Sequence, residues 1–512
     1  MRKQPASQET LDRLYANTGL NFTICTPALC SFIPKLEELL SIDIAQIPDS
    51  EEKILIELHQ VIARLNSFYN LVLLDLSTSW RASSRSASTL EKRNNLKYFN
   101  VITTEGYRYL FGKDRKFALW NKLRALTEQL GDTELMKDVE SIKRTSIEFK
   151  KEYNKPTDGK SRNFSIHYSD NPIDVYDYLS SIVDEDFEAK RISSFLSILN
   201  ELSILIIKYK EKYAFDLHSE GDTFNIGIKE RLNVFPDKAN KMLNQMTSSI
   251  PVYGNSLDKI IRLCNMPNKL IENEKFRKLD VSPINKLAET TYPAIQIHFI
   301  YLDLACCIKA YLTSEYYLEK QLNLRRMNII LYEGFNNLYG FDEGKRENTF
   351  WRKYISCHLN TSDDENACDN NISKIESKLN QMANSSLFNR DVLRGASTHY
   401  RYEDKDNLIP LFQFAVNSPP AIELMTAFAM LKVLSEIIGL NKTAMSNAYK
   451  VYKEGVDKPK NQFIEKLDLM IESTRNSDSP EEKKQELLDL IFNVRHLVED
   501  PINALKEYRK SK

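Results

Sequence analysis

Glycine and proline are scarce in this sequence, with 14 and 17 copies among 512 residues. Both residues interrupt regular structure and form turns, so a fold of many short strands would need them often. Strict alternation of polar and apolar residues, which is typical of half-buried strands, is missing as well. The chain is instead rich in Leu, Ile, Lys, Glu and Asn, and we predict an all-α fold.

Cysteine pairs with metal-binding spacing are also absent. The seven cysteines include no Cys-x-x-Cys pair, and Cys306 and Cys307 are adjacent, which disfavours a zinc site or a disulfide framework. The sequence has no glycine-rich phosphate loop and no Gly-x-Ser-x-Gly elbow, which excludes the commonest nucleotide-binding and hydrolase classes. We therefore expect no metal and no cofactor, and buried thiols in a reducing cytoplasm.

Neither sign of charge is in excess, and long apolar runs are missing. The 70 Lys and Arg residues balance 71 Asp and Glu residues, so there is no global attraction to nucleic acid or to an anionic membrane. A mildly apolar stretch at 20–33 contains Asn21, Thr23 and Pro27 and is too short to cross a bilayer. We expect a cytoplasmic protein that has no signal peptide and no contact with membranes.

Helix-starting signals are frequent along the chain. Ser50 precedes two glutamates and a long apolar-periodic run, and proline follows a capping residue at 171–172, 418–419 and 479–480. Stretches near 154–165, 216–228, 248–257, 361–369 and 401–407 are predicted loops. Helical periodicity predicts helices at roughly 51–80, 83–111, 115–130, 133–153, 172–183, 187–215, 285–312, 315–340, 347–358, 370–384, 420–438, 441–454, 460–474 and 480–509.

An internal repeat is the most informative pattern. Leu-Asp-Leu at 74–76 recurs at 302–304, and Leu-Glu-Lys at 90–92 recurs at 318–320, both at an offset of 228. The offset then grows slightly, as loop insertions would cause. It reaches 231 between Trp120 and Trp351, and 232 between Arg162 and Arg394 and between His167 and His399.

The repeat divides the chain into five segments. We predict a leader at 1–50, a first helical repeat at 51–215, a bridge at 216–279, a second repeat at 280–455 and a helical tail at 456–512. The tail is strongly charged, and we interpret it as a packing or oligomerisation helix. Within the repeats, the tryptophans are expected in the core, the aspartates at 75 and 303 as buried polar groups, and the Glu-Lys pairs as ion pairs.

Each copy carries an Arg-x4-His-Tyr motif. The first reads RNFSIHY at 162–168, and the second reads RGASTHY at 394–400. Only seven histidines occur in the chain, and two of them occupy the same motif position. We predict as catalytic residues Arg162, Asn163, His167, Arg394 and His399.

The motif and its helical setting resemble those of the HEPN superfamily, helical-bundle proteins of which many are ribonucleases of toxin and antiviral systems. The family signature is an Arg, four to six residues and a His, usually with a polar residue directly after the Arg. Asn163 fits this pattern and Gly395 departs from it. The resemblance implies two HEPN-like bundles and metal-independent cleavage of RNA to 2′,3′-cyclic phosphate and 5′-hydroxyl ends.

The chemistry of such a site follows from the two residue types. RNA is cleaved without metal when its 2′-hydroxyl attacks the adjacent phosphate, which requires proton transfer and stabilisation of negative charge. Histidine, with an ordinary pKa near ~6.5, can act as acid or base. Arginine presents a planar fork of donors that suits phosphate oxygens.

Two motifs are better suited to this chemistry than one. Helical positions i and i+5 lie about 140° apart around the axis, so a single helical motif does not focus both side chains on one atom. HEPN ribonucleases typically solve this by dimerising. We hypothesise that the duplication supplies a pseudo-dimer within one chain, with one composite cleft formed by both motifs.

A local basic segment leads into the first motif, and it predicts a path for the RNA backbone. A solvated helix face and loop is an equally good interpretation of that segment. The candidate RNA-contacting residues are Lys150, Lys151, Lys155, Lys160, Tyr168 and Tyr400.

Two functional hypotheses therefore stand. In the first, the protein is an endoribonuclease, a toxin or antiviral effector whose partners are RNA, a protein antitoxin or regulator, and a second copy in a homodimer. In the second, the protein is a catalytically inactive helical scaffold that binds RNA or protein. Asn163 and the paired Arg-His motifs favour the first, while Gly395 and the neutral overall charge favour the second.

Overall fold

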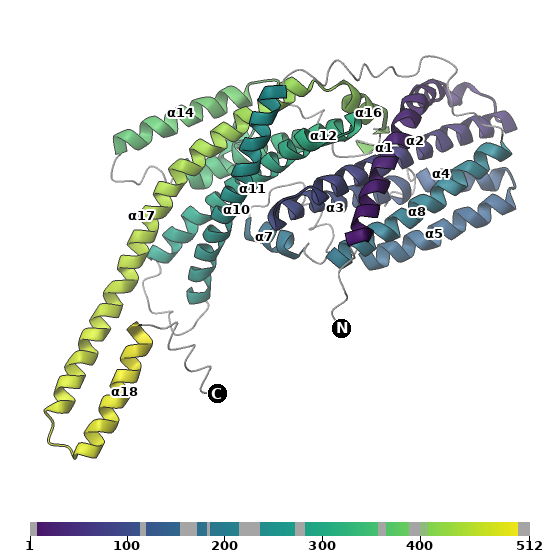
Figure 1. The fold of residues 1–512 in the computed structure, drawn as a ribbon. Helices are drawn as coiled ribbons and strands as arrows, with labels where there is room; N and C mark the ends of the chain where they lie inside the picture. The colour runs from purple at the N-terminus through teal and green to yellow at the C-terminus, as the bar shows by residue number, and fades with distance from the viewer. Residues whose placement is uncertain are drawn as a thin grey trace. The chain divides into compact units, whose positions relative to one another are not determined.

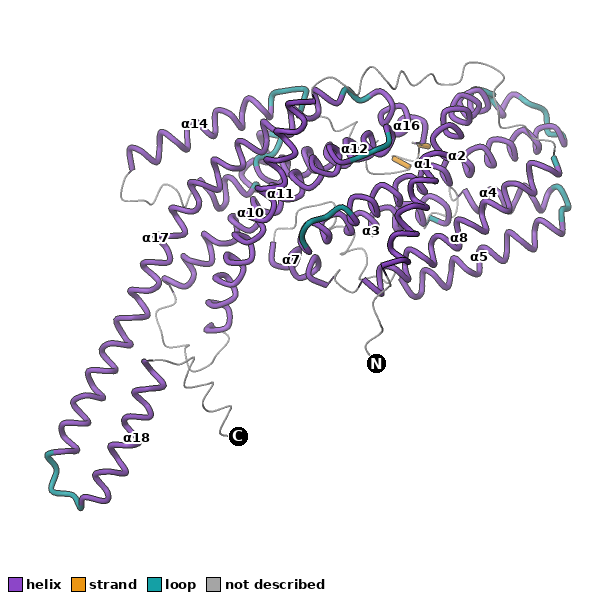
Figure 2. The backbone as a smooth tube through the Cα atoms, in the orientation of Figure 1, coloured by secondary structure: helices purple, strands orange, loops and turns teal. Residues whose placement is uncertain are grey.

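Helices make up nearly all of the chain that the computed structural model describes (Figures 1 and 2). Within that part, the only strands are β1 (Arg401–Tyr402) and β2 (Lys405–Asp406), a two-residue antiparallel pair. The predicted all-α class is confirmed. The structure describes residues 8–112, 119–153, 172–181, 185–213, 236–271, 282–356, 365–388, 401–402, 405–406 and 408–499.

The chain forms two compact units. The first comprises Met1–Arg262 and Tyr292–Leu440, and the second comprises Leu263–Thr291 and Asn441–Lys512. The first unit therefore includes most of both predicted repeats.

The N-terminal part of the first unit is a set of antiparallel helices around α2. Helix α2 contacts α1, α3, α4 and α8, and α5 lies against α4 and α8 (Figure 1). The helices are α1 (Gln8–Leu40), α2 (Glu51–Ser84), α3 (Thr89–Phe111), α4 (Leu119–Gln129), α5 (Thr133–Tyr153), α7 (Pro172–Ser181) and α8 (Glu185–Lys212), with a 3₁₀ turn η1 (Ile44–Gln46) after α1.

Helix boundaries here follow the local chemistry of the sequence. Ser50 caps α2 by accepting the Lys53 backbone N–H at 3.3 Å, and Ser88 caps α3 by accepting the Glu91 N–H at 3.2 Å. Each cap satisfies a backbone donor that the first helical turn leaves unpaired. The helix start predicted at Ser50 is confirmed.

The remaining elements run from α10 to α18. Helix α12 contacts α16, α2 and α1. The elements are α10 (Pro236–Ile271), α11 (Ser282–Thr313), α12 (Tyr317–Leu338), a 3₁₀ turn η3 (Glu343–Asn348), a π-helical turn η4 (Trp351–Ile355), α14 (Glu365–Ala383), α16 (Leu408–Asn417), α17 (Pro420–Arg475) and α18 (Glu481–Glu499).

Two sequence predictions about helix continuity are wrong. The loop predicted at 248–257 lies inside α10, because Met246, Ile250 and Leu257 recur at helical spacing and are buried. The breaks predicted near 439 and 455–459 do not occur, since α17 is continuous. Gly439 lies between the buried residues Ile437 and Asn441, so this single glycine lowers helix propensity without ending the helix.

The core is dense where α3 meets α8. A Cβ atom added to Gly106 of α3 would lie 2.9 Å from the Phe195 ring of α8, so only glycine allows this approach. The tryptophans at 120 and 351 are 1% and 0% exposed, which confirms their predicted place in the core. The five cysteines whose burial the structure describes, at 25, 30, 264, 306 and 307, are buried free thiols, as predicted.

Two helical stretches are long and apolar enough to cross a membrane by length and composition. These are Thr290–Thr313 of α11 and Lys190–Lys212 of α8, whose most apolar windows are 89% and 44% buried. The core helices of soluble proteins pass the same test, so the pattern is weak evidence for membrane spans.

Candidate functional site

The residues of both Arg-x4-His motifs lie outside the described part of the structure. This applies to Arg162, Asn163, His167, Arg394 and His399, and to the candidate RNA contacts Lys155, Lys160, Tyr168 and Tyr400. The described elements on either side nevertheless place the two segments at matching points of the chain order. The first lies between α5 and α7, and the second lies between α14 and α16.

The most developed polar assembly in the described structure joins the two helix pairs α2–α3 and α11–α12 within the first unit. Asp75 of α2 accepts from Arg325 of α12 at 3.0 Å, and Lys97 of α3 donates to Asp303 of α11. All four side chains are buried. Asp75 and Asp303 are 228 positions apart, and so are Lys97 and Arg325, so the two ion pairs are reciprocal.

A second pair of contacts repeats the same relation. Lys309 of α11 is 2.7 Å from Glu91 of α3, and Arg81 of α2 is 3.3 Å from Glu319 of α12. Arg81 and Lys309 are 228 positions apart, and Glu91 and Glu319 are too. Of the two predicted possibilities for these glutamates, inter-helix ion pairs are confirmed, and both glutamates are buried rather than at the surface.

A third pair of contacts repeats the relation with only one charged side chain, that of Arg326. Tyr98 Oη lies 3.9 Å from the Cys307 thiol, and the Arg326 guanidinium donates to the Ser79 hydroxyl. The offset between the matching positions is again 228. We call the three reciprocal pairs of contacts, made by Asp75, Ser79, Arg81, Glu91, Lys97, Tyr98, Asp303, Cys307, Lys309, Glu319, Arg325 and Arg326, the seam.

The residues of the seam have a structural role rather than a catalytic one. Burial raises the pKa of Cys307 to about 11, so this thiol stays protonated at neutral pH and is a poor nucleophile. Each carboxylate of the seam has a cationic partner. Such buried, paired groups fix how two surfaces dock, because any other arrangement would leave a buried charge without its partner.

One end of the seam reaches solvent. Arg85 donates to Glu319 at 2.7 Å and to Glu315 at 2.9 Å, and Arg81 lies over the ring of Tyr15 at 4.3 Å. Burial acts to raise the pKa of Glu315, whereas the charges of Arg81 and Arg85 act to lower it. Together, the charges have the larger effect, so the pKa of Glu315 is below its ordinary value. The cluster is an ion-pair network at a surface, with no imidazole among its described members.

The exposed residues of α5 have both signs of charge, with Glu148 and Glu152 among the cations, and they include the two described candidates for RNA contact. Lys150 and Lys151 lie in its last turn and are exposed, as is Arg144. Lys143 is half-buried over the Phe111 ring at 5.0 Å. Its pKa is lowered, first by burial and then by the charge of Lys150. The helix therefore carries cations directly before the first motif.

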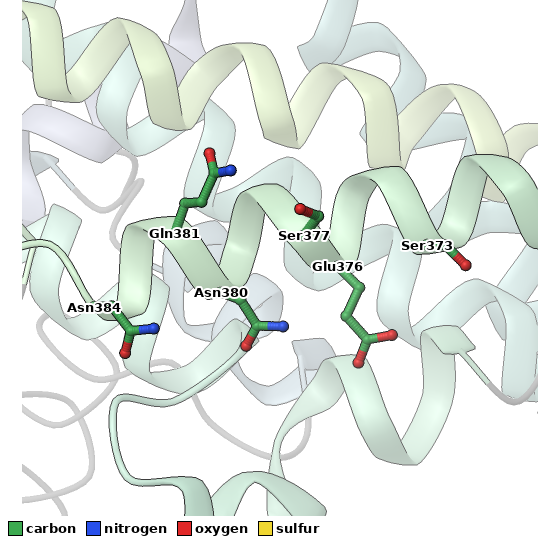
Figure 3. Close-up of a pocket in the computed structure, with 6 residues that line it drawn as sticks. All are labelled: Ser373, Glu376, Ser377, Asn380, Gln381 and Asn384. Carbon is green, nitrogen blue, oxygen red and sulfur yellow. The ribbon is translucent and has the colours of Figure 1, made fainter.

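Helix α14 has two lysines, Lys374 and Lys378, but they do not occupy the positions that match the cations of α5. A pocket of about 670 Å³ lies along this helix, and its described lining residues are Ser373, Glu376, Ser377, Asn380 and Gln381 of α14 and Asn384 just after it (Figure 3). Asn380 accepts from Tyr339 at 2.8 Å and from Arg346 at 3.0 Å. At the positions that match Arg144 and Lys151 by an offset of 232, this helix has Glu376 and Ala383.

A smaller, mostly apolar pocket of about 250 Å³ lies beneath α1. Its lining includes Leu76 and Trp80 of α2, Phe99 of α3 and Leu196 of α8. The sequence patterns did not single out these residues, because a pocket between helices depends on how the helices cross. The described lining of the pocket has no titratable side chain, so these residues could bind a small apolar group but could not transfer a proton.

No other site of familiar chemistry was found in the described residues. Across them, no group of three or more His, Cys, Asp and Glu side chains is arranged to hold a metal ion. Comparisons of the chain with protein-family models, curated proteins and solved structures found no match.

Proposed function

We propose that the chain consists of two duplicated helical halves that pair about a pseudo-twofold axis and together form a metal-independent endoribonuclease of the HEPN type. The reciprocity of the seam carries the twofold pairing, and the Arg-x4-His motif present in both halves carries the nuclease activity. In a twofold interface, residue i of one half contacts j of the other, and j of the first contacts i of the second. The seam has this property at one constant offset in three contact pairs.

The order of the helices and the spacing of their first residues support the duplication. The starts of α3 and α12 differ by 228 positions, those of α5 and α14 by 232, and those of α8 and α17 by 235. Helices α7 and α16 are both ten residues long. The offset is 231 at α2 and α11, 228 at α3 and α12, and 236 at α7 and α16, so it stays within a few residues, as small insertions and deletions in loops would produce.

The duplication also extends to a helix that precedes each predicted repeat. The two helices are α1 and α10, of 33 and 36 residues. Within them, Asn21, Leu29 and Cys30 match Asn255, Leu263 and Cys264 at an offset of 234, and both cysteines are buried. We therefore infer that the segments interpreted as leader and bridge contain the first helix of each half.

The proposed site uses one motif from each half. Helix α16, which follows the second motif, contacts α12 of its own half and α2 of the other half, and α7, which follows the first motif, contacts α3. Both motifs thus connect to helices that adjoin the seam. There His167 and His399 would transfer protons at the scissile phosphate, and Arg162 and Arg394 would stabilise its negative charge.

RNA is the substrate that the charges favour. The cations of α5 lead directly to the first motif, whereas α14 has no matching cations before the second. An RNA strand would therefore approach from the side of the first half. The associated expectations, a cytoplasmic toxin or antiviral effector held in check by a protein regulator, belong to this same proposal.

The decisive experiment is RNA cleavage by the purified chain in excess EDTA. We expect the wild type to release 2′,3′-cyclic phosphate ends, and Arg162→Ala and His167→Ala to lose the activity. His496→Ala, at an exposed histidine of α18, is the matched control and should cleave normally. Cleavage that persists in both motif variants would show that a different site or protein is responsible.

A second candidate function is a helical scaffold that binds RNA without cleaving it. Gly395 favours this function, because it replaces the polar residue expected after Arg394. An RNA-binding wild type that cleaves nothing in the same assay would support the scaffold and exclude the nuclease.

A further inference from the structure

The second unit ends in a helical hairpin. The last part of α17 and all of α18 are joined by residues 476–480 and lie side by side (Figure 1). Leu467, Ile471 and Ile491 form its buried core. Arg495 and Asp468 form an ion pair across the two helices.

The spacing of the hairpin core defines two sides. Inward positions on α17 are 464, 467, 471 and 474, and those on α18 are 484, 488 and 491. This 3-4 spacing is that of the a and d positions of a coiled coil. Positions 464, 471 and 488 are then a positions, and 467, 474, 484 and 491 are d positions. In an antiparallel pair of helices, the residues that directly precede the a positions lie on one side of the hairpin. The residues that directly follow the d positions lie on the other side.

The first of these sides is apolar and exposed. It carries Phe463 and Met470 from α17 and Leu487 from α18, with exposed fractions of 44%, 50% and 44%. Leu490, which is 60% exposed, lies next to Leu487 on the same helix face. We call these four residues the apolar face of the hairpin.

The opposite side is mainly polar. Its positions are occupied by Asp468, Arg475, Gln485 and Phe492, of which only Phe492 is apolar. Leu469, which is 65% exposed, and Phe492 lie outside the apolar face. An isolated two-helix hairpin buries one stripe per helix, so the four apolar residues gathered on one side point to association rather than to the fold of the hairpin.

We propose that the apolar face is a dimer interface, which packs against the same face of a second copy of this chain to form a four-helix bundle. A helix of 19 residues is roughly 28 Å long, and two helices side by side span roughly 20 Å. Pairing would therefore bury on the order of 1,100 Å² in total, which is near the lower bound for a specific interface.

A second copy fits this face better than a nucleic acid or an acidic partner. The face itself is uncharged, and the charged residues around it have both signs, with Lys466 and Lys483 against Glu486. In a twofold dimer the apolar face of one copy packs against the identical face of the other copy, so apolar residues contact apolar residues.

The test is the mass of the full-length chain in solution, measured by sedimentation equilibrium over a range of concentrations. We expect the wild type to reach twice 59.5 kDa. Met470→Glu combined with Leu487→Glu should weaken dimerisation at least 100-fold. Phe492→Glu, at a residue of the same helix that is 42% exposed on the other side, is the matched control and should remain dimeric.

Circular dichroism of each variant shows that its helices are intact. A wild type that stays monomeric at all concentrations would overturn the proposal. A control variant that dissociates as much as the double variant would do so as well, since the effect would then not depend on the side of the hairpin. The measurement involves no RNA, so its outcome is independent of the proposed nuclease.

Discussion

At the scale of single residues, the buried ion pairs of the seam make the sharpest stability prediction. Replacing Asp75 by Ala leaves the Arg325 guanidinium buried without the partner that it contacts at 3.0 Å. We expect a loss of roughly 3–5 kcal/mol in the free energy of unfolding, measured by urea denaturation. Asp303→Ala should cost a similar amount, because its contact with Lys97 is the reciprocal one.

The matched control for that prediction is a surface ion pair. Glu343 is 3.4 Å from Arg346 and its side chain is 81% exposed, so Glu343→Ala should change stability by less than about 1 kcal/mol. Equal losses for Asp75→Ala and Glu343→Ala would mean that the seam contributes no more than a surface contact does.

A buried histidine makes a prediction about pH. His298 lies 2.7 Å from the Ala294 carbonyl and 3.1 Å from the Ser256 hydroxyl, and burial lowers its pKa to about 4. The unfolded state, with a pKa near 6.5, takes up the proton first as the pH falls. His298 therefore stabilises the fold above pH 6.5, and this stabilisation is lost as the pH falls toward 4.

We expect the wild type to lose roughly 3 kcal/mol more than a His298→Gln variant between pH 7 and pH 4. Thermal unfolding at a series of pH values measures the difference. His496→Gln, at an exposed position, should follow the wild type. Parallel curves for wild type and His298→Gln would show that His298 is protonated equally in both states.

The two motif histidines should not be equivalent. The polar Asn163 follows Arg162, whereas Gly395 follows Arg394 and offers no side chain to orient the phosphate. His167→Ala should therefore reduce the rate of RNA cleavage more than His399→Ala, by about tenfold or more. Equal rates in the two variants would contradict the ranking.

At the scale of elements, α5 is predicted to be the RNA-contacting helix. Lys150→Gln together with Lys151→Gln removes two exposed cations, so the slope of log affinity against log salt for single-stranded RNA should fall by about 1.4. Lys374→Gln, at an exposed lysine of α14, is the control and should leave the slope unchanged. A slope unaffected by either change would remove α5 from the RNA path.

The sequence predicted most elements correctly but missed α1, α10 and the short helix α16. Scarce glycine and proline, together with caps such as Ser50, were enough to predict an all-helical fold and the start of α2. Helix α10 was missed at Pro251 and Gly254, because these residues suggest a turn unless the burial of the surrounding apolar residues is known. Helix α1 contains Pro27 and Pro34, which hide its helical pattern in the same way.

At the scale of the whole molecule, the constant offset was visible in the sequence, but the contacts that depend on it were not. Lys97 and Arg325 occupy matching positions, yet each is paired with an aspartate more than 200 residues away. No local pattern connects such partners, because only the docking of two helix pairs brings them together. The motif residues stay predictions, since they lie outside the described part of the chain.

The reciprocal seam has a consequence for how the polypeptide can be made. The contacts that hold α2–α3 against α11–α12 are side-chain interactions, so they do not depend on a peptide link between the halves. Fragments 1–213 and 236–512, expressed together from separate genes, should therefore find each other and co-purify as a split protein. Asp75→Lys in one fragment should abolish the association, and Arg325→Asp in the other should restore it.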